Sequence, residues 1–181
     1  MNFIHTIDPS WTLFLDRDGV INHEKNQDYI RNASEFVFYD GMLEALKKLS
    51  EVFGRIIIVT NQRGIGKGLM THQDLNDIHE YMLEAVTQTG GRIDRIYYAP
   101  DLDSDAIDRK PNIGMGLTAK TEFPSIDFEK SVMVGNNISD MKFGKGLGMH
   151  TVYVETTKPL EEENEFVDLK TDSLVSFTAM L

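Results

Sequence analysis

The sequence contains no cysteine among its 181 residues, which excludes disulfides and thiolate metal sites and is typical of a reducing compartment. Histidine is scarce as well: the five histidines are scattered, and none is paired with a second metal-binding residue at ligand spacing, so no zinc is expected. No apolar run approaches the roughly 20 residues of a membrane helix, and the N-terminus lacks the basic cluster of a signal peptide. We therefore expect a soluble, cytoplasmic protein.

Positive charge is also in short supply. The chain has 18 Lys and Arg against 29 Asp and Glu, a formal net charge of -11. Nucleic-acid backbones are held by clustered lysine and arginine, so this balance argues against a nucleic-acid partner. A small anionic substrate would need a local positive site. The length suits one domain, which we place at residues 1–181, and we favour a monomer.

The sequence does contain a regular alternation of short apolar runs and amphipathic stretches. Runs of strand length lie at 12–15, 55–59, 95–99, 131–135 and 150–154. Helical patterns between them open after Gly41, after Thr71 as N-cap, at 114–122, and with Ser139 as a cap. This alternation predicts an α/β fold, a Rossmann-like parallel sheet with helices on both faces. In such sheets ligands bind beyond the C-terminal ends of the strands.

Two carboxylates follow the first strand in "LFLDRDGVIN". Side chains two residues apart on an extended chain point to the same side, so Asp16 and Asp18 should project together while Arg17 points away. Such a pair is tolerated beside a divalent cation or when one group keeps its proton. One carboxylate can act as a nucleophile that forms an acyl-phosphate, and the other as general acid and base. The alternative is an ordinary turn before Gly19.

Polar groups follow other predicted strands as well. Thr60 and Asn61 can donate hydrogen bonds to phosphate oxygens. The glycines of 64–68 can leave backbone N–H groups accessible to an anion. The alternative is that these glycines form an ordinary strand-to-helix connection. In "RKP", Lys110 can bring positive charge to a phosphoryl group; the alternative is that Arg109 and Lys110 are a solvated surface pair.

The fourth polar cluster is "VGNNISD", residues 134–140. Asn136 and Asp140 offer oxygen ligands, which suit magnesium rather than zinc, although a helix cap is the competing interpretation. Because the C-terminal ends of parallel strands meet at one edge, the four clusters are expected to converge there.

These residues resemble a known family. "FLDRDGVIN", Thr60 in "VTNQRGIGKG", Lys110 in "RKP" and "VGNNISD" are similar, in order and spacing, to the four motifs of haloacid-dehalogenase-superfamily phosphatases. The first three also resemble a subgroup acting on D-glycero-D-manno-heptose 1,7-bisphosphate or histidinol phosphate. The resemblance implies a fold without a large cap domain, in which residues 22–39 form a small flap over the site.

The resemblance also implies roles for single residues. Asp16 would be the nucleophile and Asp18 the general acid and base. Mg²⁺ would be held by the Asp16 carboxylate and the Asp18 backbone carbonyl, with further ligands from Asn136 and Asp140. The phosphoryl group would be bound by Thr60, Asn61, Lys110 and Arg109.

The sequence departs from the family pattern at two places. The subgroup commonly binds zinc in the loop before R-K-P, but "YYAPDLDSDAID" has no Cys or His. The fourth motif usually begins with an aspartate, and this chain has Asn136, so we expect weaker magnesium binding unless Asp140 compensates.

The function that these motifs predict is magnesium-dependent hydrolysis of a small phosphorylated metabolite, such as a heptose bisphosphate, through an aspartyl-phosphate. Three alternatives stay open. They are a histidinol-phosphate phosphatase, a polynucleotide 3′-phosphatase, which shares the D-x-D-G and T-N-Q pattern but is disfavoured by the charge, and a non-catalytic phosphate-binding protein.

Overall fold

The computed structural model describes residues 3–181, and its centre is a six-stranded, wholly parallel sheet. The strand order is β3-β2-β1-β4-β5-β6. The strands are β1 (Thr12–Leu15), β2 (Arg55–Asn61), β3 (Arg95–Ala99), β4 (Ser131–Gly135), β5 (His150–Val154) and β6 (Leu169–Thr171). The chain winds outward from β1 in both directions, so the C-terminal end of β1 lies where the strand order reverses, the usual ligand position in such sheets.

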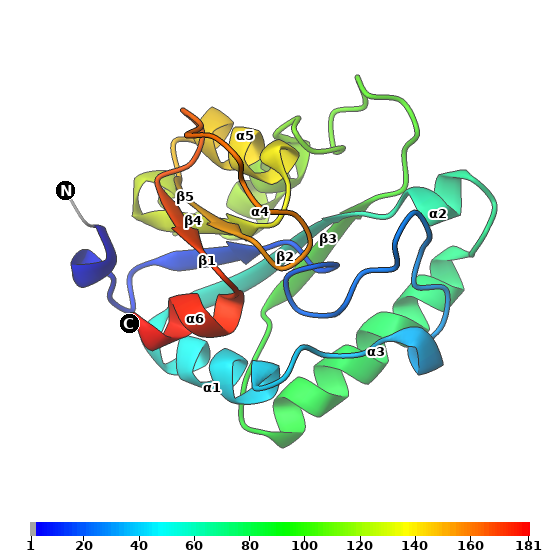
Figure 1. Ribbon diagram of the computed structural model, residues 1–181, viewed down its shortest axis with the longest axis horizontal. Coiled ribbons are helices and arrows are strands. Elements are labelled where there is room, and N and C mark those ends of the chain that lie inside the picture. The colour runs from blue at the N-terminus through cyan, green and yellow to red at the C-terminus, as the bar shows by residue number, and fades with distance from the viewer. Residues whose placement is uncertain (1–2) are drawn as a thin grey trace.

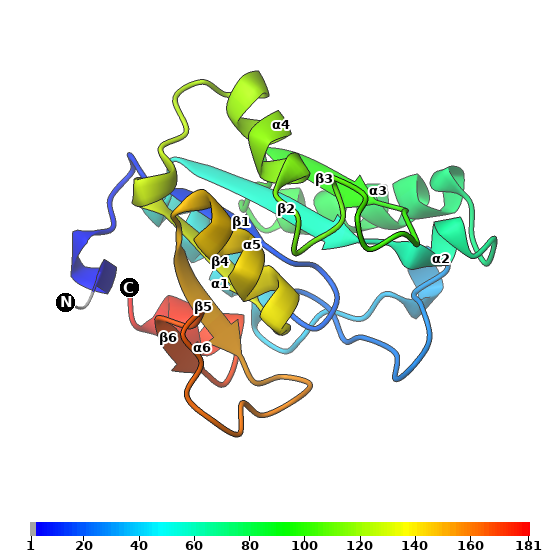
Figure 2. The same cartoon turned by 90° about the horizontal axis from the view of Figure 1, so that it is seen from above.

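Helices cover both faces of this sheet (Figures 1 and 2). One face carries α1 (Met42–Val52), α3 (His72–Gln88) and α6 (Leu174–Ala179), and the other carries α4 (Gly114–Glu122) and α5 (Ile138–Leu147). The short α2 (Arg63–Gly66) follows β2, and single 3₁₀ turns lie at Phe3–Thr6, Ala33–Glu35 and Phe128–Lys130. The predicted fold class is therefore confirmed, and residues 3–181 contain no large cap domain.

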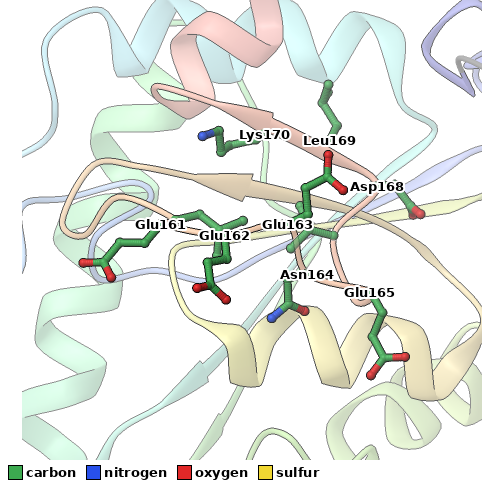
Figure 3. A pocket seen from close by; sticks show the side chains of 10 residues that line it. Glu161, Glu162, Glu163, Asn164, Glu165, Asp168, Leu169 and Lys170 are labelled. Carbon is green, nitrogen blue, oxygen red and sulfur yellow. The ribbon is translucent and has the colours of Figure 1, made fainter.

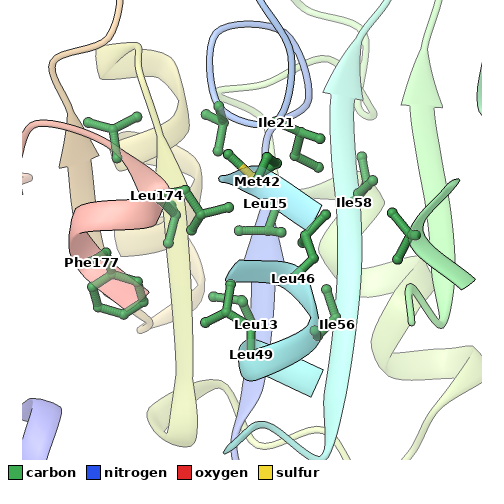
Figure 4. Packing of buried hydrophobic residues seen from close by; sticks show 14 of the residues in the cluster. Leu13, Leu15, Ile21, Met42, Leu46, Leu49, Ile56, Ile58, Leu174 and Phe177 are labelled. Atoms are coloured by element: carbon green, nitrogen blue, oxygen red, sulfur yellow. The ribbon is translucent and has the colours of Figure 1, made fainter. Parts of the chain in front are cut away.

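The alternation of side chains along the strands divides the core into two parts. Leu13 and Leu15 face α1, and the intervening Phe14 faces α5 and α4. Figure 4 shows Leu13 and Leu15 packed between Leu46 and Leu49 of the α1 helix and the neighbouring strands. All four residues of β1 are buried, as expected for a central parallel strand that is covered on both sides. The end of β1 is thus a rigid platform for whatever follows it.

Most predicted element bounds agree with the structure, with three differences. The β2 strand runs two residues further than predicted, to Asn61, because Thr60 and Asn61 pair with β3. The predicted cap at Ser139 is wrong: α5 begins at Ile138, and Asp140 Oδ2 accepts the backbone N–H of Asn137 at 3.0 Å. The β6 strand and α6 helix were not predicted. Among the helices of residues 3–181, none is long and apolar enough to cross a membrane.

Candidate active site

A cavity of about 190 Å³ opens at the C-terminal edge of the sheet, beyond β1. All of the expected site residues except Arg109 line it. The remaining lining residues come from the predicted flap at 22–39 and from the start of α5. They are Glu24, Lys25, Asp28, Tyr29, Ile30, Asn137 and Ser139. The four motifs therefore converge in one pocket, as the strand order requires.

Lys110 lies at the floor of this pocket and is 3% exposed. Its ammonium contacts Asp16 Oδ1 at 2.9 Å and Asp140 Oδ1 at 2.7 Å, and it donates to the Val59 carbonyl at 2.7 Å. Burial alone lowers the pKa of Lys110, but the two carboxylates outweigh it, so the net shift is upward. Lys110 is therefore a fixed positive charge between the end of β1 and the first turn of α5.

Asp16 directly follows β1, and its main-chain N–H donates to the Val134 carbonyl at 3.0 Å. Burial raises the pKa of its carboxyl to about 6; Lys110 pulls the pKa down, and Asp140 and Asp18 push it up. Its Oδ2 has no hydrogen-bond donor within residues 3–181. A buried carboxylate with one anchored and one free oxygen has the geometry of a nucleophile.

Asp18 is held much more tightly than Asp16. It accepts hydrogen bonds from Arg17 Nη2 at 2.8 Å, Asn22 Nδ2 at 2.9 Å and Gln62 Nε2 at 2.9 Å. Burial raises the pKa of Asp18, but Arg17 and the two amides outweigh it and lower the pKa below its ordinary value. The carboxyl is therefore ionised at neutral pH.

The prediction that Arg17 points away from the two aspartates is wrong. The β1 strand ends at Leu15, so the two-residue alternation no longer holds at position 17, and the buried guanidinium turns back onto Asp18. On its other side, Arg17 Nη1 donates to His79 Nε2 of α3 at 3.1 Å. Sequence reasoning missed His79 because nothing in its local pattern links it to a residue 62 positions away.

His79 gives the protein a measurable pH dependence. Burial, and then the charge of Arg17, lower its pKa from 6.5 to about 3, so the folded protein holds the ring neutral while the unfolded chain protonates below about pH 6.5. Stability is therefore lost as the pH falls from about 6.5 toward about 3. His79→Gln keeps an acceptor for Arg17 and does not titrate. From about pH 7 to about pH 5, the wild type should lose about 2 kcal/mol more unfolding free energy than His79→Gln in urea titrations. Parallel losses would contradict this assignment.

Thr60 and Asn61, which end β2, have different surroundings. Thr60 is 1% exposed, and its Oγ1 accepts from Gln62 Nε2 at 2.9 Å, which leaves the hydroxyl proton available to an anion in the pocket. The Asn61 side chain instead donates to the Lys110 carbonyl at 3.1 Å and accepts from the Lys110 N–H at 3.0 Å. Asn61 thus holds the backbone of Lys110 in place. Gln62, which joins Thr60 to Asp18, was not singled out from the sequence.

The glycines after β2 do not cradle an anion. None of them lines the pocket. A Cβ at Gly66 would lie 2.4 Å from the Pro100 carbonyl oxygen, and one at Gly64 would lie 3.0 Å from Met70 Sδ. These glycines allow close packing of the loop, as in an ordinary strand-to-helix connection.

Asn136 and Asp140 differ in their capacity to bind a cation. Both Asp140 oxygens are occupied, Oδ1 by Lys110 and Oδ2 by the N–H of Asn137. Asn136 is 6% exposed; its Nδ2 donates to Thr157 Oγ1 at 2.9 Å, while its Oδ1 has no donor in the part of the chain that the structure describes. Within residues 3–181, no three His, Cys, Asp or Glu side chains form a metal-binding cluster. The donors left free are the Asn136 amide oxygen and Asp16 Oδ2, and such hard oxygen donors fit Mg²⁺.

Arg109 is not brought to the pocket. Its Nη1 donates to the Leu102 carbonyl, and Asn112 Nδ2 donates to the carbonyls of Ser104 and Ala106 at 2.8 and 2.9 Å. These bonds tie together the loop before Lys110. Arg109 therefore has a structural partner in place of the expected phosphate.

A larger cavity, about 740 Å³, has none of the motif residues in its lining. Figure 3 shows the side chains that line it. It is lined by the acidic segment 160–165 and by residues 167–170. The glutamates of this segment are exposed, so residues 161–165 form a solvated acidic loop.

Comparisons with known proteins agree with this geometry. The family model described as polynucleotide kinase 3 phosphatase matches residues 12–166. The D-glycero-alpha-D-manno-heptose-1,7-bisphosphate 7-phosphatase of Campylobacter jejuni is 36% identical over 160 residues, 87% of this chain and 91% of that protein. The D-glycero-beta-D-manno-heptose-1,7-bisphosphate 7-phosphatase of Haemophilus influenzae is 34% identical over 178 residues, 93% of this chain and 95% of that protein.

Solved structures give the same result. The D,D-heptose 1.7-bisphosphate phosphatase from B. bronchiseptica, complexed with magnesium and phosphate, superposes with a TM-score of 0.82 at 25% identity, covering 93% of this chain and 96% of that one. A HAD-superfamily hydrolase from Geobacter sulfurreducens, at 14% identity and a TM-score of 0.57, shares the fold. The chain is therefore a phosphatase that belongs to the polynucleotide kinase 3 phosphatase family, within the haloacid-dehalogenase-like superfamily.

Proposed function

We propose that this protein is a magnesium-dependent phosphatase of a phosphorylated sugar, D-glycero-D-manno-heptose 1,7-bisphosphate, with Asp16 as the nucleophile. The observation that carries the proposal is the meeting of Asp16, Thr60 and Lys110 in one small pocket at the end of β1. The names of the relatives from Campylobacter jejuni and Haemophilus influenzae support the substrate. The bacterial structure complexed with magnesium and phosphate supports the cation.

In the first half of the reaction, the Asp16 carboxylate attacks phosphorus, the bond from phosphorus to the sugar oxygen breaks, and the phosphoryl group becomes an acyl-phosphate on Asp16. The Lys110 ammonium and the Thr60 hydroxyl stabilise the negative charge on the phosphoryl oxygens. A bound Mg²⁺, held by Asp16 and the Asn136 amide oxygen, would neutralise further charge on the phosphoryl group. In the second half, water attacks phosphorus and releases phosphate, which restores the Asp16 carboxylate.

Asp18 is assigned the proton transfers. Its lowered pKa suits the second half, in which a base must take a proton from the attacking water. To protonate the sugar oxygen in the first half, Asp18 must first gain a proton. A substrate phosphate dianion in the same pocket raises the pKa of Asp18 by like-charge repulsion, which favours that proton.

Residues 22–39 are proposed to act as the small flap over the substrate. Glu24, Lys25, Asp28 and Tyr29 line the pocket from this segment. Within it, Lys25 is paired with Glu35 at 2.7 Å and Asp28 with Arg31 at 2.6 Å. These pairs hold the flap in one conformation beside the catalytic residues.

The test is phosphate release from four substrates, each with Mg²⁺ and with EDTA. The substrates are the α and the β anomer of heptose 1,7-bisphosphate, because the relatives differ in the anomer that they are named for, histidinol phosphate, and a 3′-phosphorylated oligonucleotide. We expect the highest kcat/KM on a heptose bisphosphate, and no release in EDTA. A higher kcat/KM on either other substrate would overturn the proposed substrate, and hydrolysis of none of them would favour a phosphate-binding protein.

A further inference from the structure

The amide of Asn136 is fixed by three separate segments of the chain. Its Nδ2 donates to Thr157 Oγ1, in the loop after β5, at 2.9 Å and to Glu24 Oε2, in the flap, at 3.4 Å. The backbone of Gly19 packs against the same amide, since a Cβ there would lie 2.0 Å from Asn136 Nδ2. The rotation of the amide is therefore determined by its surroundings.

The direction of the amide follows from the chemistry of its partners. An ionised glutamate only accepts hydrogen bonds, so the nitrogen of Asn136, and not its oxygen, must face Glu24. The amide oxygen is thereby turned away from Glu24 and Thr157, and it has no donor within residues 3–181. A carbonyl oxygen without a protein donor, on a residue that is 6% exposed and lines a pocket of carboxylates, is a ready cation ligand.

Glu24 also differs from the other carboxylates of the pocket in its charge balance. Asp16 and Asp140 share Lys110, Asp18 is paired with Arg17, and Asp28 with Arg31. No cationic side chain among residues 3–181 pairs with Glu24. It is therefore the uncompensated negative charge at this pocket, and it lies beside the one ligand position that carries an uncharged amide.

We propose that Glu24 and Thr157 are positioning residues that turn the Asn136 amide oxygen toward the bound cation, and that Glu24 supplies the negative charge that an aspartate at position 136 would have given. This inference rests on the proposed function, because it requires a divalent cation in the pocket. It gives the flap a second role, since residue 24 completes the cation site as well as covering it.

The test measures Mn²⁺ affinity of the substrate-free protein from the free-ion signal in electron paramagnetic resonance. Glu24→Gln keeps the acceptor and removes the charge, and it should raise the Kd about tenfold, as is usual for the outer partners of a metal ligand. Glu161→Gln is the matched control, because Glu161 lines the adjacent cavity beside Thr157 but is exposed and lies outside the candidate active site, and this substitution should leave the Kd unchanged. Thr157→Val should weaken binding, whereas Thr157→Ser, which retains the hydroxyl, should not.

A double variant separates this role from a general loss of charge. Asn136→Asp places a negative charge at position 136, and this charge is repelled by the Glu24 carboxylate. Adding Glu24→Gln to that variant should therefore leave the Kd for Mn²⁺ unchanged or lower it. An equal Kd for Glu24→Gln and Glu161→Gln, or a tenfold loss in both backgrounds, would overturn the inference. The failure of this inference and the failure of the proposed substrate are distinguishable. Hydrolysis of the heptose bisphosphate with a Kd that does not depend on Glu24 would refute only the inference. A Kd that depends on Glu24, without hydrolysis of that substrate, would refute the proposed substrate and leave the cation site.

Discussion

Asp16→Asn is expected to abolish phosphate release, by about 10⁴-fold or more, and to leave the protein folded. The substitution keeps the shape of the side chain and an acceptor for Lys110, but an amide oxygen cannot form the acyl-phosphate. In single-turnover reactions quenched with acid, the wild type should carry phosphate on the protein, and the variant should carry none. Release within about tenfold of the wild type would contradict Asp16 as the nucleophile.

The stability of this variant should move in the opposite direction to its activity. Because burial raises the pKa of Asp16 to about 6, the ionised carboxylate is disfavoured in the folded protein at neutral pH relative to the unfolded chain. Asp16→Asn removes that buried charge, so its free energy of unfolding at about pH 7.5 should equal or exceed that of the wild type. As a control, Asp77→Asn, on the exposed side of α3, should leave both activity and stability unchanged. A variant clearly less stable than the wild type would show that Asp16 serves the fold as well.

The sequence predicts the sheet well because its signal is local. The strand 131–135 is a continuous apolar run, as a strand buried on both faces must be, and its observed bounds are the predicted ones. The β6 strand has no such run, since Leu169–Thr171 is three residues long, lies at the sheet edge and is only half-buried. Edge elements of this kind are held by tertiary contacts, which no short window of sequence displays.

In the candidate site, the positions of the residues were predictable from local sequence, whereas their side-chain partners were not. That Asp16, Thr60, Lys110 and Asn136 meet was predictable, because each follows a strand or a motif whose place in the fold is known once the sheet is parallel. What each side chain does there depends on partners from distant segments. Asn61 was predicted to bind phosphate, and its amide instead holds the Lys110 backbone, 49 positions away.

Lys110 is expected to be the residue whose loss costs the most stability. It is 3% exposed and joins Asp16, Asp140 and the Val59 carbonyl, so that the ends of β1 and β2 and the first turn of α5 are connected through one ammonium group. Lys110→Met keeps the length of the side chain and leaves two carboxylates facing each other without a counter-ion. Removing one partner of a buried ion pair costs about 3–5 kcal/mol of unfolding free energy. Phosphate release should be lost as well, because Lys110 is the cation that contacts the proposed nucleophile, Asp16.

The matched control for this loss is Lys145→Met. Lys145 also contacts a carboxylate, Asp168 at 2.6 Å, but its side chain is 29% exposed. Because exposed ion pairs contribute little, the loss of Lys145 should cost less than about 1 kcal/mol of unfolding free energy.

The pH dependence of the Lys110→Met variant identifies the cause of its instability. Without Lys110, the remaining carboxylates have raised pKa values, and the folded variant binds a proton that the unfolded chain releases above about pH 4. The variant should therefore recover stability relative to the wild type as the pH falls from about 8 toward about 5, in urea titrations. A deficit that does not change over this range would assign the loss to packing of the methylene chain rather than to the uncompensated charge of Asp16 and Asp140.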